Sequence, residues 1–126
     1  MQLEMRNDFK GSDALVLLGD RGDFIALAEG WSDWAKQERV CNFSDLLTGR
    51  SIGGSISVGI QPTAAGGLSG IRWSSEEGGR LLWMLTPEVA TQFAGLIEGL
   101  VERQVGHTYL ESPDDELLVV CSLGES

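Results

Sequence analysis

The sequence has few of the residues from which most active sites are built. It contains one histidine, His107, and two cysteines, Cys41 and Cys121. Nucleophilic catalysis needs a nucleophile, a base and an orienting group, and a catalytic zinc ion usually takes three protein ligands. The spacing of these three residues fits neither arrangement, and the glycine-rich stretches lack the lysine and the strand–loop–helix order of a phosphate loop. We therefore expect no cofactor and no metal ion.

The scarcity of cysteine and of long apolar runs bears on where the protein works. Cys121 alternates with Leu117 and Val119 and is expected to be buried, whereas Cys41 lies in a polar stretch. A disulfide between them is possible, but two cysteines do not form the framework of a secreted domain. No apolar run approaches the roughly 20 residues that cross a bilayer, and the first residues lack a signal-peptide core. We expect a cytoplasmic protein that does not enter the membrane.

Basic residues are also scarce. Nine lysines and arginines stand against 19 acidic residues, which gives a formal net charge of −10. The excess is concentrated after Leu85, where Arg103 is the one base. Such a surface repels nucleic acid and anionic membranes but attracts a basic protein and speeds their encounter. Solubility alone is the other explanation, because net charge bears on association and solubility rather than on fold.

The first third of the chain indicates a strand followed by a helix. The apolar run Ala14–Asp20 predicts a short buried strand ended by Gly19. Asp20 or Asp23 can then accept hydrogen bonds from the free N–H groups of a first helical turn. The helix is expected to run to about Gln37 with one apolar stripe, which comprises Phe24, Leu27, Ala28, Trp31 and Trp34.

The glycine-rich middle of the chain predicts short strands and turns. Alternation over Ser55–Ile60 indicates a half-buried strand. The stretch "GIRWSSEEGGRLLWML" predicts a β-hairpin with Glu76 and Glu77 in its turn. A turn centred on Glu77 and Gly78 pairs Trp73 with Leu82, which places Trp83 on the same sheet face as Arg72. The second strand is apolar on both faces, so it should be central or covered on both sides.

The last third predicts a helix and two strands. Thr86 is a natural N-cap, and Pro87 fits the first helical position because its missing N–H is not needed there. The expected buried stripe comprises Val89, Phe93, Leu96, Ile97, Leu100 and Val101. The strands "HTYLE" and "ELLVVCS" follow, joined by a turn that contains Asp114 and Asp115. Residues 1–126 thus predict a single α+β domain: a mainly antiparallel sheet of about five or six strands, with two long helices packed on it.

The segment "WMLTPEVATQFAGLIEGLVERQVGHTYLESPDDELLVVCS", about a third of the chain, resembles small α+β bacterial proteins. They share a strand, a Leu-Thr-Pro-Glu helix start, an amphipathic helix, a Gly-His-x-Tyr-Leu segment and a final apolar strand. Some of them resemble the immunity proteins of bacterial polymorphic-toxin systems. The resemblance implies a compact domain that binds and occludes a toxin without chemistry of its own, and it transfers no functional residues.

Charge and resemblance together predict a non-enzymatic acidic immunity protein. Its partner would be a basic toxin domain that acts on nucleic acid or nucleotides, because such a domain complements an acidic surface. The expected partner-binding residues are Glu111, Asp114, Asp115, Glu116, Glu76, Glu77 and Trp83. Two alternatives stay open: a small cytoplasmic enzyme that uses Cys41 or His107, and a phage-encoded acidic inhibitor of a bacterial defence complex. The sequence does not name the toxin or the oligomeric state.

Overall fold

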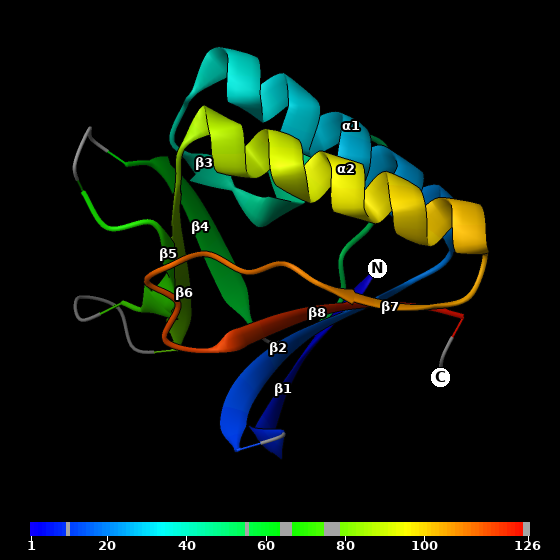
Figure 1. Cartoon of the computed structure of the whole chain (residues 1–126), viewed down its shortest axis with the longest axis horizontal. Coiled ribbons are helices and arrows are strands. Elements are labelled where there is room, and N and C mark those ends of the chain that lie inside the picture. Colours follow the sequence, from blue (N-terminus) through cyan, green and yellow to red (C-terminus); the bar gives the residue numbers. More distant parts are fainter. Residues whose placement is uncertain (10, 55, 64–66, 75–78, 125–126) are drawn as a thin grey trace.

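Two helices lie side by side across two small β-sheets in the computed structural model of the chain (Figure 1). The structure describes residues 1–9, 11–54, 56–63, 67–74 and 79–124. The helices are α1 (Arg21–Gln37) and α2 (Pro87–Arg103), and a short 3-10 turn, η1, covers Phe43–Leu46. The strands are β1 (Gln2–Phe9), β2 (Ser12–Gly19), β3 (Cys41–Asn42), β4 (Ser57–Pro62), β5 (Gly70–Trp73), β6 (Arg80–Leu85), β7 (Gly106–Tyr109) and β8 (Leu118–Leu123).

The described strands form two four-stranded mixed sheets, with the orders β1-β2-β8-β7 and β3-β4-β6-β5. Each has a parallel central pair, β2 with β8 and β4 with β6, flanked by antiparallel neighbours. The α+β class and the two long helices are therefore confirmed. The prediction of a single sheet of five or six strands was wrong, whereas its mainly antiparallel character holds for four of the six described strand pairs. The two parallel pairs join strands that are not consecutive in the sequence and leave no local pattern.

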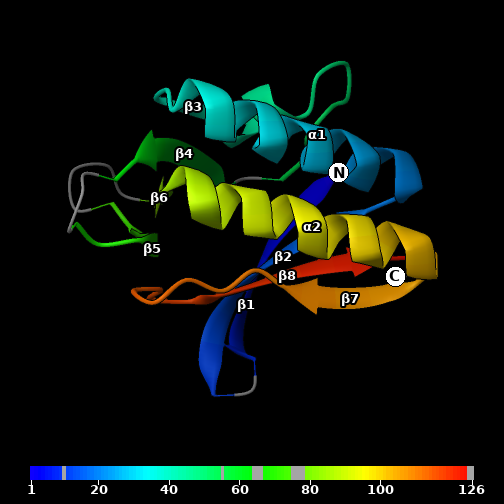
Figure 2. The same cartoon turned by 45° about the horizontal axis from the view of Figure 1, so that its top comes forward.

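The two sheets reveal an internal repeat of the order strand, strand, helix, strand, strand. Exchanging β1–β4 and α1 with β5–β8 and α2 converts the strand order of one sheet into that of the other. Each sheet thus contains one hairpin from each half of the chain. The helices run in opposite directions along each other, as such a pseudo-twofold arrangement requires (Figures 1 and 2).

The helices of the two halves match position by position. Both have 17 residues, so that Arg21 corresponds to Pro87 and Gln37 to Arg103. Five buried positions coincide, in the pairs Phe24/Ala90, Leu27/Phe93, Ala28/Ala94, Trp31/Ile97 and Trp34/Leu100. Four of these pairs join different residue types, which conceals the repeat in the sequence.

The predicted helix starts are confirmed, and one predicted core residue was wrong. The Asp20 carboxylate accepts the Asp23 N–H, and the Asp23 carboxylate accepts the Asp20 N–H, which together form a capping box. Thr86 caps α2 through the Val89 N–H. Leu96, expected in the core, is 44% exposed, and its place is taken by Ala90 and Ala94. The spacing of the apolar residues did not distinguish these neighbouring stripes.

The hairpin of β5 and β6 forms as predicted, but its register is shifted by one residue. Ile71 pairs with Trp83 and Trp73 pairs with Leu81, so Trp83 shares a face with Trp73 and not with Arg72. Both faces of β6 are apolar, so alternation alone could not fix the register. β6 is central in its sheet, as its apolar character indicated. The predicted turn residues Glu76 and Glu77 lie outside the described residues.

An aromatic cluster links the helices to the second sheet. Trp31 of α1 meets Trp83 of β6 edge to face at 5.1 Å between ring centroids. Phe93 of α2 lies 5.6 Å from Trp31 and 5.4 Å from Trp83. All three side chains are buried. This packing fixes the two helices over the sheets and determines which of their surfaces face outward.

Candidate functional site

The acids of the predicted turn differ in their side-chain contacts: Asp114 and Asp115 accept hydrogen bonds from the backbone, whereas Glu111 and Glu116 form no described side-chain contact. The connection between β7 and β8 crosses to the other sheet and pairs with the edge strand β5. The Glu116 N–H donates to the Ile71 carbonyl at 2.9 Å, and the Ile71 N–H donates to the Asp115 carboxylate at 2.9 Å. The Asp114 carboxylate accepts the Ser69 N–H at 2.9 Å. These contacts close an edge that would otherwise present unpaired backbone groups.

Of these acids, Asp115 accepts the most side-chain hydrogen bonds among the described contacts. Its second carboxylate oxygen accepts the Ser112 N–H at 2.7 Å, so the carboxylate holds both its own connection and β5. Burial raises the pKa of this carboxyl above the ordinary value, with smaller contributions from Glu111 and Asp114, although the two backbone hydrogen bonds oppose the shift. Glu111 and Glu116 are exposed. Within the turn, the exposed Glu111 and Glu116 are therefore the residues best placed to meet a partner.

Trp83 was wrongly predicted as a partner-binding residue. Its side chain is 0% exposed and packs in the aromatic cluster, so it cannot contact another protein while the fold is intact. The prediction failed because it followed from the shifted hairpin register. Arg72 lies on the opposite face of the hairpin, where it contacts the Met84 sulfur.

The residues considered for catalysis do not form one group, although His107 and Cys121 lie on paired strands. Cys41 is in β3 of one sheet, and His107 and Cys121 are in β7 and β8 of the other. Both cysteines are free and buried, and burial raises the pKa of each thiol. His107 is exposed, and its ring meets Tyr109 edge to face at 5.7 Å. In the part of the chain that the structure describes, no cluster of three His, Cys, Asp or Glu residues could hold a metal ion.

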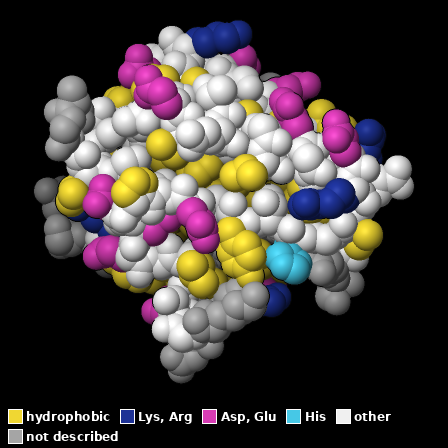
Figure 3. All heavy atoms as spheres, viewed as in Figure 1, with side chains coloured by type: hydrophobic (Ala, Val, Ile, Leu, Met, Phe, Trp, Pro, Cys, Tyr) yellow, Lys and Arg dark blue, Asp and Glu magenta, His cyan; other side chains and the backbone are white. Residues whose placement is uncertain are grey.

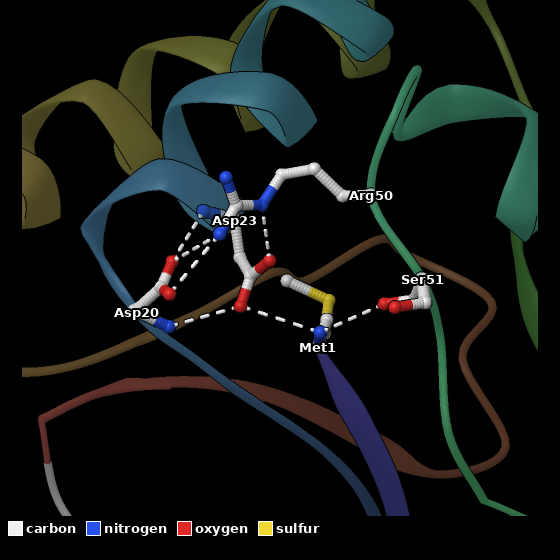
Figure 4. A network of polar contacts seen from close by, with 5 residues as sticks. All are labelled: Met1, Asp20, Asp23, Arg50 and Ser51. Carbon is white, nitrogen blue, oxygen red and sulfur yellow. Dashed lines mark hydrogen bonds and ion pairs between the residues drawn. The ribbon is translucent and has the colours of Figure 1, made fainter.

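An ion-pair network lies at the start of α1 (Figure 4). The Arg50 guanidinium reaches the Asp23 carboxylate at 2.6 Å and the Asp20 carboxylate at 2.9 Å, and the Met1 amino nitrogen lies 3.3 Å from Asp23. Burial alone would raise the pKa of Asp23, but these partners and the Asp20 N–H outweigh it and lower the pKa. The sequence "RGD" at Arg21–Asp23 thus forms the first turn of α1. The network joins α1 to the connection between β3 and β4.

A groove that sequence reasoning missed runs between the outward surfaces of α1 and α2. It contains two hollows. The first, of about 310 Å³, is lined by Ile25, Ala28, Glu29, Glu98, Val101 and Glu102. The second lies toward the other end of the helices and is lined by Ser32, Ala35, Lys36, Pro87, Glu88 and Thr91. The sequence offered only the helical spacing of these residues, because the groove depends on how the helices lie together.

The acidic character of the chain is visible on this side of the molecule. Asp and Glu side chains gather over the helices and over the connection between β7 and β8, whereas Lys and Arg side chains are few and scattered (Figure 3). Glu29, Glu98 and Glu102 are exposed and form no ion pair with any described residue. The same holds for Glu111 and Glu116. We call these five carboxylates, three on the helices and two on the connection between β7 and β8, the candidate partner-binding surface.

Neither helix in the described part of the chain is long and apolar enough to cross a membrane. Comparison with family models, with curated proteins and with solved structures gives no match. The functional assignment therefore depends on the residues and on their geometry.

Proposed function

We propose that this chain is a non-enzymatic inhibitor that binds and occludes a basic protein, in the manner of the immunity proteins of bacterial polymorphic-toxin systems. The observation that carries the proposal is the candidate partner-binding surface, whose five carboxylates lack ion-pair partners among the described residues. Exposed acids on a chain of net charge −10 attract a basic partner from a distance.

The mechanism needs positioning and charge rather than bond chemistry. A toxin that acts on nucleic acid or nucleotides holds phosphates with lysines and arginines. Carboxylates held on helices and on a hydrogen-bonded connection can meet those cations with a small ordering cost. Opposite charges raise the association rate, and the covered toxin surface can then no longer admit its substrate.

A small enzyme that uses Cys41 or His107 is the alternative from another class. Burial raises the pKa of the Cys41 thiol, which is then protonated at neutral pH and a poor nucleophile. His107 lies in the other sheet, so it is not placed to activate Cys41. These observations favour the inhibitor. A phage-encoded inhibitor of a bacterial defence complex would use the same acidic surface, and the identity of the bound protein separates it from an immunity protein.

The proposal is tested by expressing the product of the neighbouring open reading frame with and without this chain. We expect the neighbouring product to stop growth when expressed alone, and this chain to restore growth and to co-purify with it as a complex that high salt weakens. A neighbour that is harmless, or a toxic neighbour that this chain neither binds nor neutralises, would overturn the assignment as an immunity protein.

Protection should survive Cys41→Ala and His107→Ala, because neither residue performs chemistry in an inhibitor. The measurement is growth of the co-expressing strain, with thermal unfolding followed by circular dichroism to show that each variant is folded. Loss of protection in a folded variant would instead support an enzyme.

A further inference from the structure

The two hollows of the groove between α1 and α2 share several matched positions but differ in size, at about 310 and 670 Å³, and in chemistry. In the matched helices, four lining positions of the first hollow correspond to lining positions of the second. The pairs are Ile25 and Thr91, Glu98 and Ser32, Val101 and Ala35, and Glu102 and Lys36. The other two positions differ, because the second hollow is lined by Pro87 and Glu88 instead.

The acids are concentrated in the first hollow. It has Glu98 and Glu102 where the second has Ser32 and Lys36, and Glu29 where the matched position is Gly95. Its floor is apolar and consists of Ile25, Ala28 and Val101. A hollow that combines an apolar floor with carboxylates around its rim complements a side chain with an aliphatic stem and a cationic head.

These acids are placed against the local preferences of the helix. Glu98 and Glu102 are four residues apart on one face, and like charges at that spacing destabilise a helix. Glu102 also stands in the last turn of α2, where the helix dipole favours cations. Neither acid has an ion-pair partner among the described residues. A cation from outside would relieve both kinds of repulsion.

We infer that the groove is the docking site for a basic amphipathic helix of the protein partner, with its lysines or arginines over Glu29, Glu98 and Glu102. The inference rests on the proposed function and names the surface that performs it. Small side chains, Ala28, Ser32 and Ala35, face the groove from α1 and let a third helix approach closely. At 1.5 Å per residue, each 17-residue helix offers a contact about 25 Å long, which suits a helix-in-groove interaction.

The test uses a fluorescent peptide with leucine and lysine at the spacing of an amphipathic helix. A control peptide has the same composition, in an order that spreads the leucines around the helix. Fluorescence anisotropy measures the affinity of both peptides for the chain, and amide chemical shifts locate the binding site. The wild type should prefer the amphipathic peptide, with shifts concentrated along the outward faces of α1 and α2.

The double variant Glu98→Gln/Glu102→Gln should bind the amphipathic peptide roughly tenfold more weakly. Its thermal stability should be unchanged or slightly higher, because a like-charge pair is removed. The matched control is Glu4→Gln/Asp13→Asn, which changes the net charge equally on the β1–β2 hairpin, away from the helices, where Glu4 is half-buried and pairs with Arg6 at the surface (Figure 1). The control should bind nearly as well as the wild type.

Equal weakening by both double variants, equal binding of both peptides, or shifts outside the helices would overturn the groove proposal. These outcomes are separable from a failure of the proposed function. If the chain protects cells and the groove variant protects equally well, the groove is not the docking site but the inhibitor assignment stands. If the peptide binds in the groove but the neighbouring product is not neutralised, the inhibitor assignment alone is lost.

Discussion

Among single residues, Asp115 shows that an acid in a turn can stabilise the fold. Its two oxygens accept the Ile71 and Ser112 N–H groups, and both donors belong to partly buried bonds. Asparagine offers one acceptor oxygen, so Asp115→Asn leaves one of these N–H groups without a partner. We expect a loss of about 1–2 kcal/mol in the free energy of unfolding, measured by urea denaturation. The matched variant Glu116→Gln, one residue away and exposed, should have almost no effect.

The same residue should leave a signature in the pH dependence of stability. Because burial raises the pKa of Asp115 in the folded state, the folded chain holds its proton at a pH where the unfolded chain has lost it. Its stabilising contribution is therefore fully present below the unfolded pKa and is lost as pH rises through the raised folded pKa. Asp115→Asn should remove this decline in the free energy of unfolding with rising pH. An unchanged pH profile in that variant would show that the carboxyl is not desolvated.

Asp23 should behave in the opposite way. Its folded pKa is lowered despite burial, because Arg50, the Asp20 N–H and the Met1 amino group stabilise the charged form. The stability that this network contributes is present above the unfolded pKa and is lost as pH falls through the lowered folded pKa. Arg50→Met should therefore destabilise the chain near neutral pH, and the deficit should shrink in acid. Denaturant midpoints of both proteins across this range test it, and a deficit independent of pH would contradict the network.

At the scale of helices and strands, the sequence predicted the features that depend on residues close together in the chain. Both helices begin at the caps that Asp20 and Thr86 indicated, and β2, β4 and β6 lie within or close to the apolar runs that predicted them. β1 was missed, although Leu3 and Met5 alternate with Gln2, Glu4 and Arg6 as in a half-buried strand. Its polar residues outnumber the apolar ones, so the run did not stand out.

Features that depend on distant contacts could not be predicted. The pairing of β2 with β8 joins the two ends of the chain, and no local pattern specifies it. The contacts that Asp114 and Asp115 make at the edge strand β5 could not be predicted either. The residue types indicated a turn, but not the strand that this turn covers. The groove required both the antiparallel packing of the helices and the repeat, whose matched residues differ in size and type.

At the scale of the whole molecule, charge should act on the rate of binding more than on the lifetime of the complex. Glu111 and Glu116 are exposed on a connection that is held in place by hydrogen bonds to β5. Charges at the rim of an interface steer the encounter, and salt screens them over about 8–10 Å. Unlike Asp114 and Asp115, these two residues can be changed without breaking a described side-chain contact.

The double reversal Glu111→Lys/Glu116→Lys should therefore slow association with the neutralised partner by roughly tenfold at low salt. It should also flatten the dependence of the association rate on salt, while the dissociation rate changes little. Stopped-flow mixing over a range of salt concentrations measures both rates, and Glu4→Lys/Asp13→Lys on the β1–β2 hairpin supplies the same change in net charge elsewhere. A similar slowing by both reversals would assign the effect to net charge alone. No slowing by the first would leave the two glutamates as solubilising groups and restrict partner recognition to the groove between α1 and α2.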